Sequence, residues 1–440
     1  EISECLVGSE MCIRDRNKKE MTPEERLAAA LVPEEEQPYE LPEGWKWVRL
    51  DGLSDIIMGQ SPRGFDTTDD SSYTPLIGGA ADMGAKELTP HKYTKVVTKL
   101  SRKNDLVLCI RATLGRPVVS DGEYCLGRGV AGIRTIAGAV DWIRYYLIQS
   151  ESYLYEHATG STFLQVTGKV LSDMPVPYPT VSEQQRLVAR IESLFAKLDA
   201  AKAKVQSVFD AHETRKAALL HDAFAGKLTA KWREARGVTG DVYQSVPLAD
   251  VCKSIFDGDH MPPPKSSRGI PFLVISNVNK GKLDFSETRF VPQDYYDKLT
   301  DTRKPESGDV LYTLVGTYGI PVLVDTDQAF CFQRHMALLK PKEDVILQRY
   351  LWYALQEKDF YREATRIAKG TAQLTVPIKG LRQLTIPMAS LPEQQEIVAI
   401  LDRLLGREEE VRQSAESVLV AIDSMKQSIL ARAFHGELGA

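Results

Sequence analysis

The chain has 440 residues, of which 43 % are hydrophobic and 26 % charged, and its net charge is −5. This composition is typical of a soluble globular protein with two or three domains. The sequence contains no apolar run of 18 or more residues, so it predicts no membrane span. Its six cysteines form no Cys-x-x-Cys pair and no cluster with zinc spacing, which argues against common zinc modules and favours reduced thiols in the cytosol.

Charge is distributed unevenly along the chain. Residues 86–116 carry eight Lys or Arg and two acids, a local charge of +6, whereas residues 20–43 carry eight acids and one Arg, a local charge of −7. The ordinary interpretation is a solvated charge run. The alternative is a local basic face that meets nucleic-acid phosphate although the whole chain is acidic.

The first residues read unlike the rest of the chain. Residues 1–16 lack an initiating Met and carry two of the six cysteines. We therefore expect residues 1–20 to be a non-native or disordered extension, with Met21 as the start. Residues 21–44 predict a short helix over residues 23–31 and then an acidic linker flanked by prolines.

A β-rich domain is predicted over residues 45–180. Strand-like runs separated by Gly-rich turns lie at residues 74–77, 106–110, 117–119 and 132–136. A helix is predicted over residues 141–156, and a Pro-x-Pro strand within residues 171–179 ends the domain.

The second half of the chain repeats the plan of the first. Ser182-Glu183-Gln184-Gln185 returns 210 residues later as Pro392-Glu393-Gln394-Gln395, and Trp352, Gly370 and Pro387 answer Trp142, Gly160 and Pro177 at the same offset. Matching positions within the two β-rich parts have smaller offsets, about 198 to 204 residues. Insertions are therefore expected in the loops of these parts. The repeat predicts a second β-rich domain over residues 246–390.

Each repeated motif opens a long amphipathic helix, predicted over residues 181–226 and 391–436, with a linker at 227–245 between the first helix and the second domain. Thr180 and Glu183, like Ser390 and Glu393, have the spacing of a capping box. Gly226 and Gly436 stand where a left-handed C-cap is expected.

Apolar residues in both helices keep a spacing of four and three, which is typical of a two-helix coiled coil. Each helix has about 44 residues, which correspond to roughly 66 Å at 1.5 Å per residue. The rhythm breaks at His212, Arg215 and Glu408, which we interpret as tolerated polar positions or contacts to something else. The predicted helix interface consists of Leu187, Ile191, Leu194, Leu198, Val205, Ile397, Leu401, Leu404, Val411, Val418 and Ile422.

No catalytic constellation is found in the sequence. Residues 127–132 match Gly-x-Gly-x-x-Gly, but a strand-like run follows them where a dinucleotide site needs a helix. Gly160 and Gly168-Lys169 have the wrong spacing for a P-loop, and the seven histidines include no His-Glu-x-x-His pattern. We expect no metal site in this chain.

Three pairs of polar loops lie at equivalent places in the two β-rich domains. They are residues 59–62 with 257–262, 111–115 with 315–319, and 160–165 with 370–373. Ordinary strand turns are the alternative, but Gln, Arg, Ser and Thr can bind phosphate or read base edges. The candidate DNA-binding residues in and beside these loops are Gln60, Ser61, Arg63, Lys92, Lys95, Arg111, Thr113, Arg116, Ser161, Thr162, Gln165, Asp257, His260, Asn277, Thr317, Tyr318, Lys369, Thr371 and Gln373.

The duplicated Glu-Gln-Gln helix starts, the Pro-x-Pro strands before them and the two-module plan resemble the DNA specificity subunits of type I restriction-modification systems, over residues 21–440. The resemblance implies an α+β fold with two β-rich target recognition domains separated by two long antiparallel coiled-coil helices, related by a pseudo-twofold internal repeat. It implies a non-catalytic subunit in the prokaryotic cytoplasm, in which each domain reads one half of a bipartite asymmetric site in double-stranded DNA.

The same resemblance implies partners that carry the chemistry. The helices would dock methyltransferase subunits, two in number, and a restriction subunit that is an ATP-dependent translocase and nuclease would join them. S-adenosylmethionine, ATP and Mg²⁺ are expected on those partners, and no cofactor on this chain. The alternatives are a DNA-binding scaffold or repressor without restriction partners, a nuclease or methyltransferase in its own right, and a structural coiled-coil adaptor.

Overall fold

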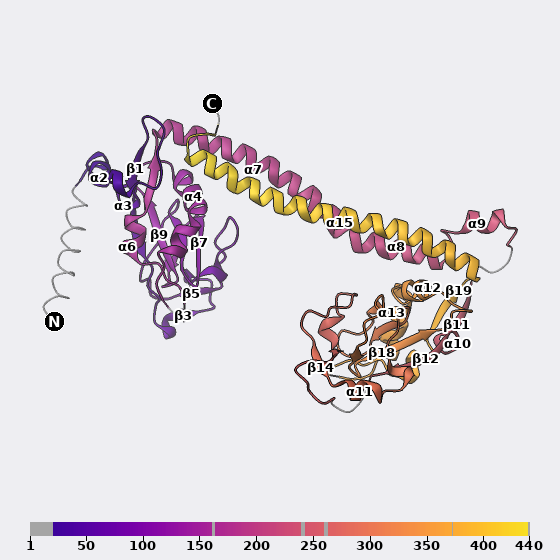
Figure 1. The fold of residues 1–440 in the computed structure, drawn as a ribbon. Coiled ribbons are helices and arrows are strands. Elements are labelled where there is room, and N and C mark those ends of the chain that lie inside the picture. The colour runs from indigo at the N-terminus through magenta and orange to yellow at the C-terminus, as the bar shows by residue number, and fades with distance from the viewer. Residues whose placement is uncertain (1–20, 161–162, 239–242, 259–262, 372, 439–440) are drawn as a thin grey trace. The chain divides into compact units, whose positions relative to one another are not determined.

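The computed structural model describes residues 21–160, 163–238, 243–258, 263–371 and 373–438. The chain divides into two compact units (Figure 1): unit 1 comprises Glu1–Lys204 and Leu419–Ala440, and unit 2 comprises Val205–Val418. The predicted extension at residues 1–20 lies outside the described residues. None of the described helices is both long and apolar enough to cross a membrane.

Unit 1 is built on three small sheets. The first is antiparallel and has the order β2-β9-β6-β7, with the bounds Ser54–Met58, Val130–Thr135, Leu106–Arg111 and Thr113–Val119. The second has the order β3-β5-β4-β8, with the bounds Thr67–Thr68, Lys92–Thr94, Thr74–Ile77 and Cys125–Leu126. The third pairs β1 (Lys46–Arg49) with β10 (Pro175–Tyr178). The strand-like runs identified in the sequence are therefore confirmed.

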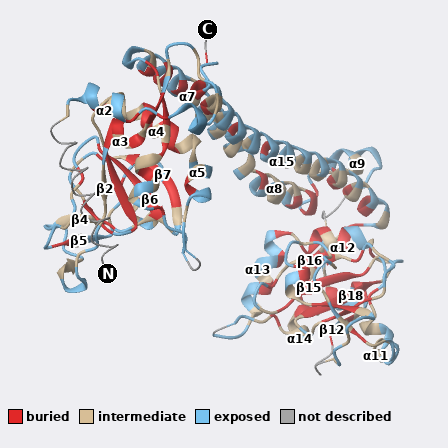
Figure 2. Ribbon diagram, turned by 60° about the vertical axis from the view of Figure 1, so that its left-hand side comes forward, coloured by how far each residue is buried: buried red, intermediate tan, exposed pale blue. Residues whose placement is uncertain are grey.

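Unit 2 repeats these sheets, except that the second has three strands. The first sheet has the order β12-β18-β15-β16, with the bounds Cys252–Asp257, Met336–Pro341, Val310–Thr313 and Pro321–Leu323. The second has the order β14-β13-β17, with the bounds Arg289–Val291, Ile270–Leu273 and Cys331–Phe332. The third pairs β11 (Gln244–Pro247) with β19 (Thr385–Met388). Figure 2 shows that the buried residues of each unit concentrate in the strands of these sheets.

Short helices complete the two β-rich parts. In unit 1 they are α2 (Pro23–Ala29), α3 (Leu50–Leu53), α4 (Val140–Gln149), α5 (Glu151–Glu156) and α6 (Gly168–Asp173), with 3-10 turns η1 (Glu34–Glu36), η2 (Gly64–Asp66) and η3 (Ala80–Asp82). In unit 2 they are α9 (Ala230–Ala235), α10 (Leu248–Val251), α11 (Gln293–Asp297), α12 (Gln348–Ala354), α13 (Lys358–Ile367) and α14 (Ile378–Leu381), with η4 (Ile275–Asn277) and η5 (Asp301–Arg303).

Two local predictions differ from this structure. The helix predicted over residues 141–156 is two helices, α4 and α5, which meet at Ser150. The Pro-x-Pro strand lies within residues 171–179 as predicted, and helix α6 ends at Asp173 just before β10 begins. The predicted linker at 227–245 contains helix α9 and strand residues of β11.

The acidic segment after Met21 is packed against unit 1. Thr22 and Glu25 form a complete capping box at the start of α2. Arg26 is buried and donates hydrogen bonds to the Asp55 carboxylate (3.0 Å) and the Asp51 carbonyl (2.7 Å). Tyr39 donates to the Phe434 carbonyl at 3.1 Å. The Tyr39 bond joins this segment to the C-terminal part of unit 1.

The long helices are α7 (Val181–Asp210), α8 (His212–Phe224) and α15 (Leu391–Phe434). Helix α15 has 44 residues, as predicted. The first helix was expected to be continuous, but it is interrupted at Ala211. At this break the Arg215 guanidinium donates to the Val208 carbonyl at 3.1 Å and to the Glu408 carboxylate at 2.7 Å. Carbonyls near a helix end lack their usual backbone donors, and the Arg215 side chain donates to one of them, that of Val208.

In each unit the helices pair antiparallel. In unit 1, Lys202 bonds Asp423 at 2.7 Å and Lys426 bonds Asp199. In unit 2, the polar residues that interrupt the heptad rhythm come together, since Arg215 contacts Glu408 and His212 lies 3.9 Å from the same carboxylate. The polar positions are therefore partners of one another across the helix pair.

The predicted apolar interface is buried at its ends and exposed in the middle of α15. Five members are buried, namely Leu187, Ile191, Ile397, Leu401 and Ile422. Four are partly buried, namely Leu194, Leu198, Val205 and Leu404. The prediction is wrong for Val411 and Val418, whose side chains are 43 % and 44 % exposed and so do not lie in a buried helix interface.

The repeated glutamines attach the long helices to the β-rich parts. Gln184 is fully buried; its Oε1 accepts from the Ala139 amide (2.8 Å) and its Nε2 donates to the Pro179 carbonyl (2.9 Å). Gln394 is equally buried; its Oε1 accepts from the Leu347 amide (2.9 Å). Ala139 and Leu347 are the N-cap residues of α4 and α12. Each glutamine therefore supplies the same link in its unit.

The predicted capping boxes are only partly formed. Thr180 Oγ1 accepts from the Glu183 amide at 3.3 Å, but the Glu183 carboxylate pairs with Arg186 at 2.8 Å. The Glu393 carboxylate is buried and accepts from Thr229, Tyr243 and Arg233 at 2.7 to 2.8 Å. The Glu393 carboxylate therefore bonds residues distant in sequence. The left-handed C-caps are confirmed, with φ of 72° at Gly226 and 75° at Gly436.

One proposed equivalence is wrong. Trp142 is fully buried and donates to the Pro177 carbonyl at 2.8 Å. In unit 2 the matching bond, to the Pro387 carbonyl at 2.8 Å, comes from the Tyr350 hydroxyl and not from Trp352. The offset in this region is therefore 208 residues, because one more insertion separates it from the helix start.

Candidate nucleic-acid interface

Four chain segments meet at one edge of unit 1, which we call the unit 1 edge: residues 59–63, 110–116, 126–130 and 163–165. Gln60 and Ser61 therefore lie on the same edge as Arg111 and Gln165. The bonds that join the segments run from Gln60 N to Leu126 O (2.8 Å), Arg128 N to Ser61 Oγ (3.1 Å), Ile110 N to Gly129 O (3.0 Å) and Ala112 N to Leu164 O (2.9 Å).

Unit 2 has the same arrangement, the unit 2 edge: residues 257–258, 314–319, 332–336 and 373–375. The bonds that join these segments run from Gly258 N to Met336 O (3.3 Å), Leu314 N to His335 O (2.8 Å) and Gly316 N to Leu374 O (3.0 Å). The bridges Arg111–Gln165 and Val315–Thr375 occupy matching places. The three loops predicted in each unit thus lie together at its edge, as far as the structure describes them.

Several residues at or beside the two edges have positive φ values. Ala112 and Arg116 have positive φ values of 62° and 56°, which is unusual for residues with a Cβ. In the adjoining loop Gly160 has φ of 113°, and Gly370 has 122° at the matching place of unit 2. A Cβ on either glycine would lie 2.3 Å from a backbone carbonyl oxygen. Strained loops of this kind often carry function.

A hollow of about 450 Å³ lies beside residues 60–63. Gln60, Ser61 and Arg63 line it together with Val96 and Thr98, and the Thr98 hydroxyl bonds the Gln60 carbonyl. Lys95 is held nearby, since its amide donates to the Asp66 carbonyl at 2.9 Å. Polar and basic candidates from two separate chain segments therefore surround one opening.

Most predicted binding residues are accessible. The exposed ones are Gln60, Ser61, Arg63, Lys92, Lys95, Arg116, Gln165, Thr317, Lys369, Thr371 and Gln373, and those of intermediate exposure are Arg111, Thr113 and Asp257. Asp257 lies 3.9 Å from Arg303. Ser161, Thr162 and His260 lie outside the described residues.

Two predicted binding residues are buried, and these predictions are wrong. Asn277 is 5 % exposed; its amide group accepts from Val274 N (2.9 Å) and donates to Glu287 O (3.3 Å), so it stabilises a turn. Tyr318 is 9 % exposed, and its hydroxyl bonds Thr365 at 3.1 Å. Both polar groups are used inside unit 2.

The sequence interpretation missed one segment of each edge, residues 126–130 and 332–336. The first was considered only as a dinucleotide motif and rejected. A usable signal existed, because Arg128 is followed 206 residues later by Arg334. An offset of 206 is what the neighbouring strands β8 and β17 also show.

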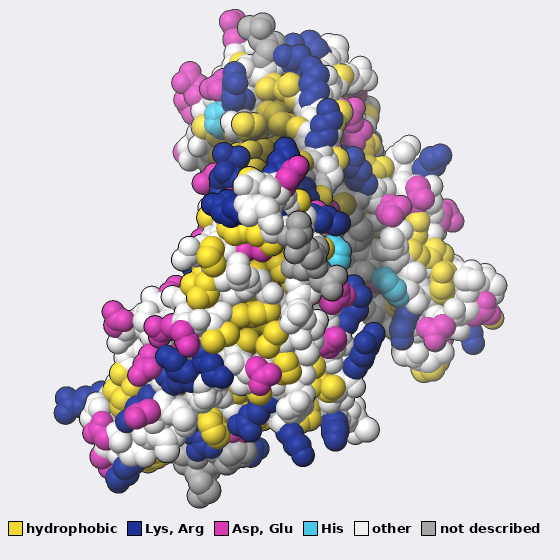
Figure 3. All heavy atoms as spheres, turned by 90° about the vertical axis from the view of Figure 1, so that its right-hand side faces the viewer, with side chains coloured by type: hydrophobic (Ala, Val, Ile, Leu, Met, Phe, Trp, Pro, Cys, Tyr) yellow, Lys and Arg dark blue, Asp and Glu magenta, His cyan; other side chains and the backbone are white. Residues whose placement is uncertain are grey.

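Charged side chains of both signs are mixed on one face of the molecule. On the face seen in Figure 3, Lys and Arg side chains are interspersed with acidic and hydrophobic ones. At the unit 2 edge, burial and the Arg334 guanidinium lower the pKa of His335. A lowered pKa favours the neutral form of His335, and Arg334 carries a positive charge in the same turn.

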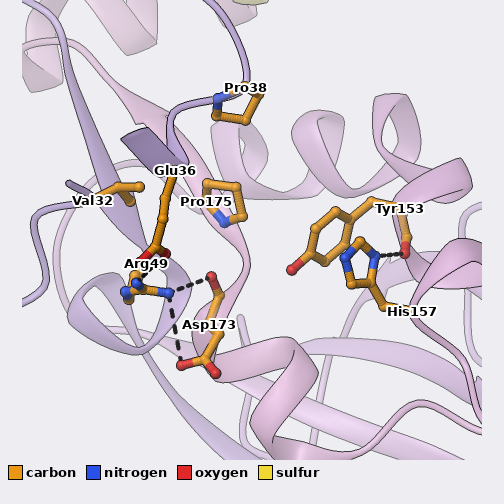
Figure 4. A pocket seen from close by; sticks show the side chains of 8 residues that line it. All are labelled: Val32, Glu36, Pro38, Arg49, Tyr153, His157, Asp173 and Pro175. Atoms are coloured by element: carbon orange, nitrogen blue, oxygen red, sulfur yellow. Dashed lines mark hydrogen bonds and ion pairs between the residues drawn. The ribbon is translucent and has the colours of Figure 1, made fainter. Parts of the chain in front are cut away.

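A second hollow, of about 430 Å³, lies away from the unit 1 edge (Figure 4). Arg49 pairs with Glu36, at 2.6 Å, and with Asp173 on one side of it, while Tyr153 and His157 stack on the other side. Its lining residues come both from the acidic N-terminal segment and from the rest of unit 1. Its charged groups satisfy one another, so we interpret it as a structural contact.

One group of side chains has metal-ligand composition. Ligand atoms of His221, Glu357 and Asp359 lie within 4.8 Å of one another. However, His221 pairs with Glu357 at 3.5 Å, and Asp359 pairs with Arg362 at 2.7 Å. The carboxylates also stand at the N-terminus of α13, where the helix dipole disfavours a cation. We assign no metal to them.

The family model for the type I restriction modification DNA specificity domain matches twice, at residues 42–208 and 241–416. The chain belongs to this family.

Specificity subunits of type I restriction enzymes are also its relatives in sequence. The chain is 23 % identical to the EcoKI specificity subunit of Escherichia coli K12, over 91 % of this chain and 90 % of that protein. It is 24 % identical to the EcoBI specificity subunit of Escherichia coli, over 66 % of this chain. That match spans 64 % of the EcoBI protein, a little under two thirds.

Solved structures support the same fold. The chain aligns with a TM-score of 0.73 and 20 % identity to a chain from a study of complex assembly and conformational transition of the type I R-M system, over 91 % of this chain and 100 % of that one. The TM-score is 0.55, at 20 % identity, to the HsdS subunit of Thermoanaerobacter tengcongensis, over 92 % and 100 %. The predicted α+β fold with an internal repeat is confirmed, and membership favours a type I specificity subunit over a scaffold or repressor without restriction partners.

Proposed function

We propose that each edge binds one half of a bipartite site in double-stranded DNA, with unit 1 reading one half and unit 2 the other. The recurrence of the same four-segment edge in both units supports this most directly. Loops presented by a rigid scaffold are where recognition commonly resides. Protein groups on such loops can contact base edges, phosphates or both.

The recognised site should be asymmetric, because the two edges carry different side chains. Arg111 of unit 1 corresponds to Val315 of unit 2, and Gln165 corresponds to Thr375. Arginine can bond guanine and glutamine can bond adenine, whereas valine offers only apolar contact. Two edges with one backbone plan and different chemistry would select different half-sites.

We further propose that this chain supplies recognition and its partners supply catalysis. Two methyltransferase subunits would dock on the long helices, with a restriction subunit that hydrolyses ATP. S-adenosylmethionine, ATP and Mg²⁺ would then reside on those partners. Val411 and Val418, exposed on α15, are suited to such docking because large apolar side chains on a helix surface gain from being covered.

The decisive experiment exchanges one module. Residues 45–180 are replaced by the corresponding segment of another specificity subunit, the complex is assembled with its methyltransferase, and methylated sites are sequenced in a host without the system. Only one half of the bipartite site should change. The matched chimera exchanges residues 246–390 and should change the other half. A change in both halves from a single exchange would contradict modular reading.

A second experiment tests the helices as a spacer. Removal of one heptad from both helices shortens the pair by about 10 Å, which is about three base pairs at 3.4 Å each. The spacer between the half-sites should change, or specific methylation should be lost. An unchanged spacer with full methylation would separate half-site spacing from helix length.

A further inference from the structure

The Gly-Arg-Gly turn at residues 127–129 lies where chain segments cross closely. A Cβ on Gly129 would lie 2.2 Å from the Gly78 carbonyl oxygen, and one on Gly127 would lie 3.1 Å from the Gly78 Cα. A Cβ on Gly59 would lie 2.1 Å from the Gly127 carbonyl oxygen. Three turns therefore cross closely here, and a Cβ at Gly59 or Gly129 would overlap a backbone carbonyl oxygen. This explains the first two glycines of the Gly-x-Gly-x-x-Gly pattern without a dinucleotide.

The turn presents one long basic side chain. Arg128 is exposed between two buried glycines. Its backbone amide donates to Ser61 Oγ at 3.1 Å, which fixes its position on the unit 1 edge. Within the described part of the chain, no hydrogen bond or ion pair engages its guanidinium. The backbone of Arg128 is thus bonded to the edge, while its guanidinium has no bond to any residue that the structure describes.

Unit 2 repeats the feature with a different sequence. Arg334 follows strand β17 as Arg128 follows strand β8, and it is likewise exposed. The Gln333 amide donates to Leu273 O at 3.0 Å, as the Gly127 amide donates to Ile77 O at 2.9 Å. Among the residues that the structure describes, the Arg334 guanidinium has no bonded acid either.

Both edges also make room for this turn in the same way. A Cβ on Gly258 would lie 2.8 Å from the Arg334 amide nitrogen and 2.3 Å from the Phe332 carbonyl oxygen. Gly59 stands in the matching place of unit 1. The residues that flank the arginine differ between the two turns: Gly127 and Gly129 flank Arg128, whereas Gln333 and His335 flank Arg334. The arginine is what the two turns share.

We propose that Arg128 and Arg334 are specificity-determining residues, each of which donates both guanidinium hydrogen bonds to a guanine in the major groove of its own half-site. This inference rests on the proposed function of the two edges. A fixed backbone and an unoccupied planar fork suit bidentate recognition of guanine O6 and N7. A phosphate contact would depend mainly on the positive charge and would carry no base preference.

The test uses the full chain assembled with its methyltransferase and a library of duplexes in which every position of the bipartite site is varied. R128Q should lose preference for one G·C pair in one half-site by roughly 5- to 150-fold, and R334Q should do the same in the other half only. R128K should lose part of that preference, because lysine keeps the charge but not the planar fork. R102Q is the control for loss of an exposed arginine away from the edge; it should keep every base preference, even if overall binding weakens, because Arg102 lies before the opposite end of strand β6.

The outcomes separate two kinds of failure. Uniform weakening by R128Q at every base position, rescued by R128K, would overturn base reading by this arginine. Unchanged preference in both arginine variants, with wild-type methylation of a bipartite site, would overturn the inference and leave the proposed function intact. If the wild-type complex itself recognised no bipartite site, the proposed function would fail. Melting temperatures of the variants should equal the wild-type value, because both side chains are exposed.

Discussion

Replacement of Gln394 by leucine should destabilise unit 2 in a way that replacement of its neighbour Gln395 does not. Gln394 is fully buried and makes three hydrogen bonds: it accepts from Leu347 N (2.9 Å) and donates to Ala389 O (2.9 Å) and Val345 O (3.1 Å). Leucine has a similar size, so the substitution removes polar partners with little change in volume. Gln395, next in the same motif, is exposed.

The magnitude follows from the number of bonds. A net contribution of about 1 kcal/mol per hydrogen bond gives a loss of about 3 kcal/mol for Gln394→Leu. Gln184→Leu, which removes two bonds in unit 1, should lose about 2 kcal/mol. For units of this size, about 3 kcal/mol corresponds to a fall in melting temperature of roughly 6 to 12 °C. Gln395→Leu should leave the melting temperature within about 1 °C of the wild-type value, because the side chain is exposed.

Calorimetry of the full chain measures these shifts, and amide hydrogen exchange locates them. The Leu347 amide should exchange faster in Gln394→Leu and the Ala139 amide faster in Gln184→Leu, each without effect in the other unit. If Gln394→Leu melted like Gln395→Leu and left the Leu347 amide equally protected, the bond to α12 would carry no net stability. The reasoning that the repeated motif links helix to module would then be refuted.

Three further changes test other parts of the fold. Asp105→Asn should lower the stability of unit 1 by about 3 kcal/mol in urea unfolding, because it removes the buried acid that Arg134 holds through two bonds of 2.7 and 3.0 Å; an unchanged midpoint would contradict this. Arg215→Met should lower the urea midpoint of unit 2 by the equivalent of about 2 kcal/mol, and faster amide exchange around the break in the first helix should accompany it. The bond from Arg412 lowers the pKa of Glu409 from 4.5 to about 2, so its stabilisation is present above pH 4.5 and is lost as the pH falls towards 2. Glu409→Gln should therefore cost at most about 1 kcal/mol at pH 6, since the pair is largely exposed, and melting curves of the two proteins should converge near pH 2; a constant gap would argue against this pair.

Several features could be predicted from sequence because they depend on neighbouring residues alone. Gly226 and Gly436 end their helices in the left-handed conformation, since this preference belongs to glycine itself. The strands around residues 106–111 and 130–135 followed from apolar runs between turns. The internal repeat placed the equivalent loops correctly, and three of the four segments of each edge were among them.

Other features depended on partners distant in sequence. Glu393 has the spacing of a capping box, yet it serves Thr229, Arg233 and Tyr243. Asn277 has the chemistry of a base-reading residue, yet its amide is used inside a turn. Periodicity alone cannot tell a buried polar group from an exposed one, because burial depends on which other segments fold over it.

The sequence by itself determined that one module is used twice, where the long helices begin and end, and which loops correspond. These follow from local spacing and from the repeat, which need no knowledge of any long-range contact. Only the tertiary structure decided that the loops of each unit meet at one edge of that unit, and that Arg128 belongs to the unit 1 edge and Arg334 to the unit 2 edge. The physical reason is that each edge is closed by backbone hydrogen bonds between segments as distant in sequence as Gly258 and Met336, which no local pattern encodes.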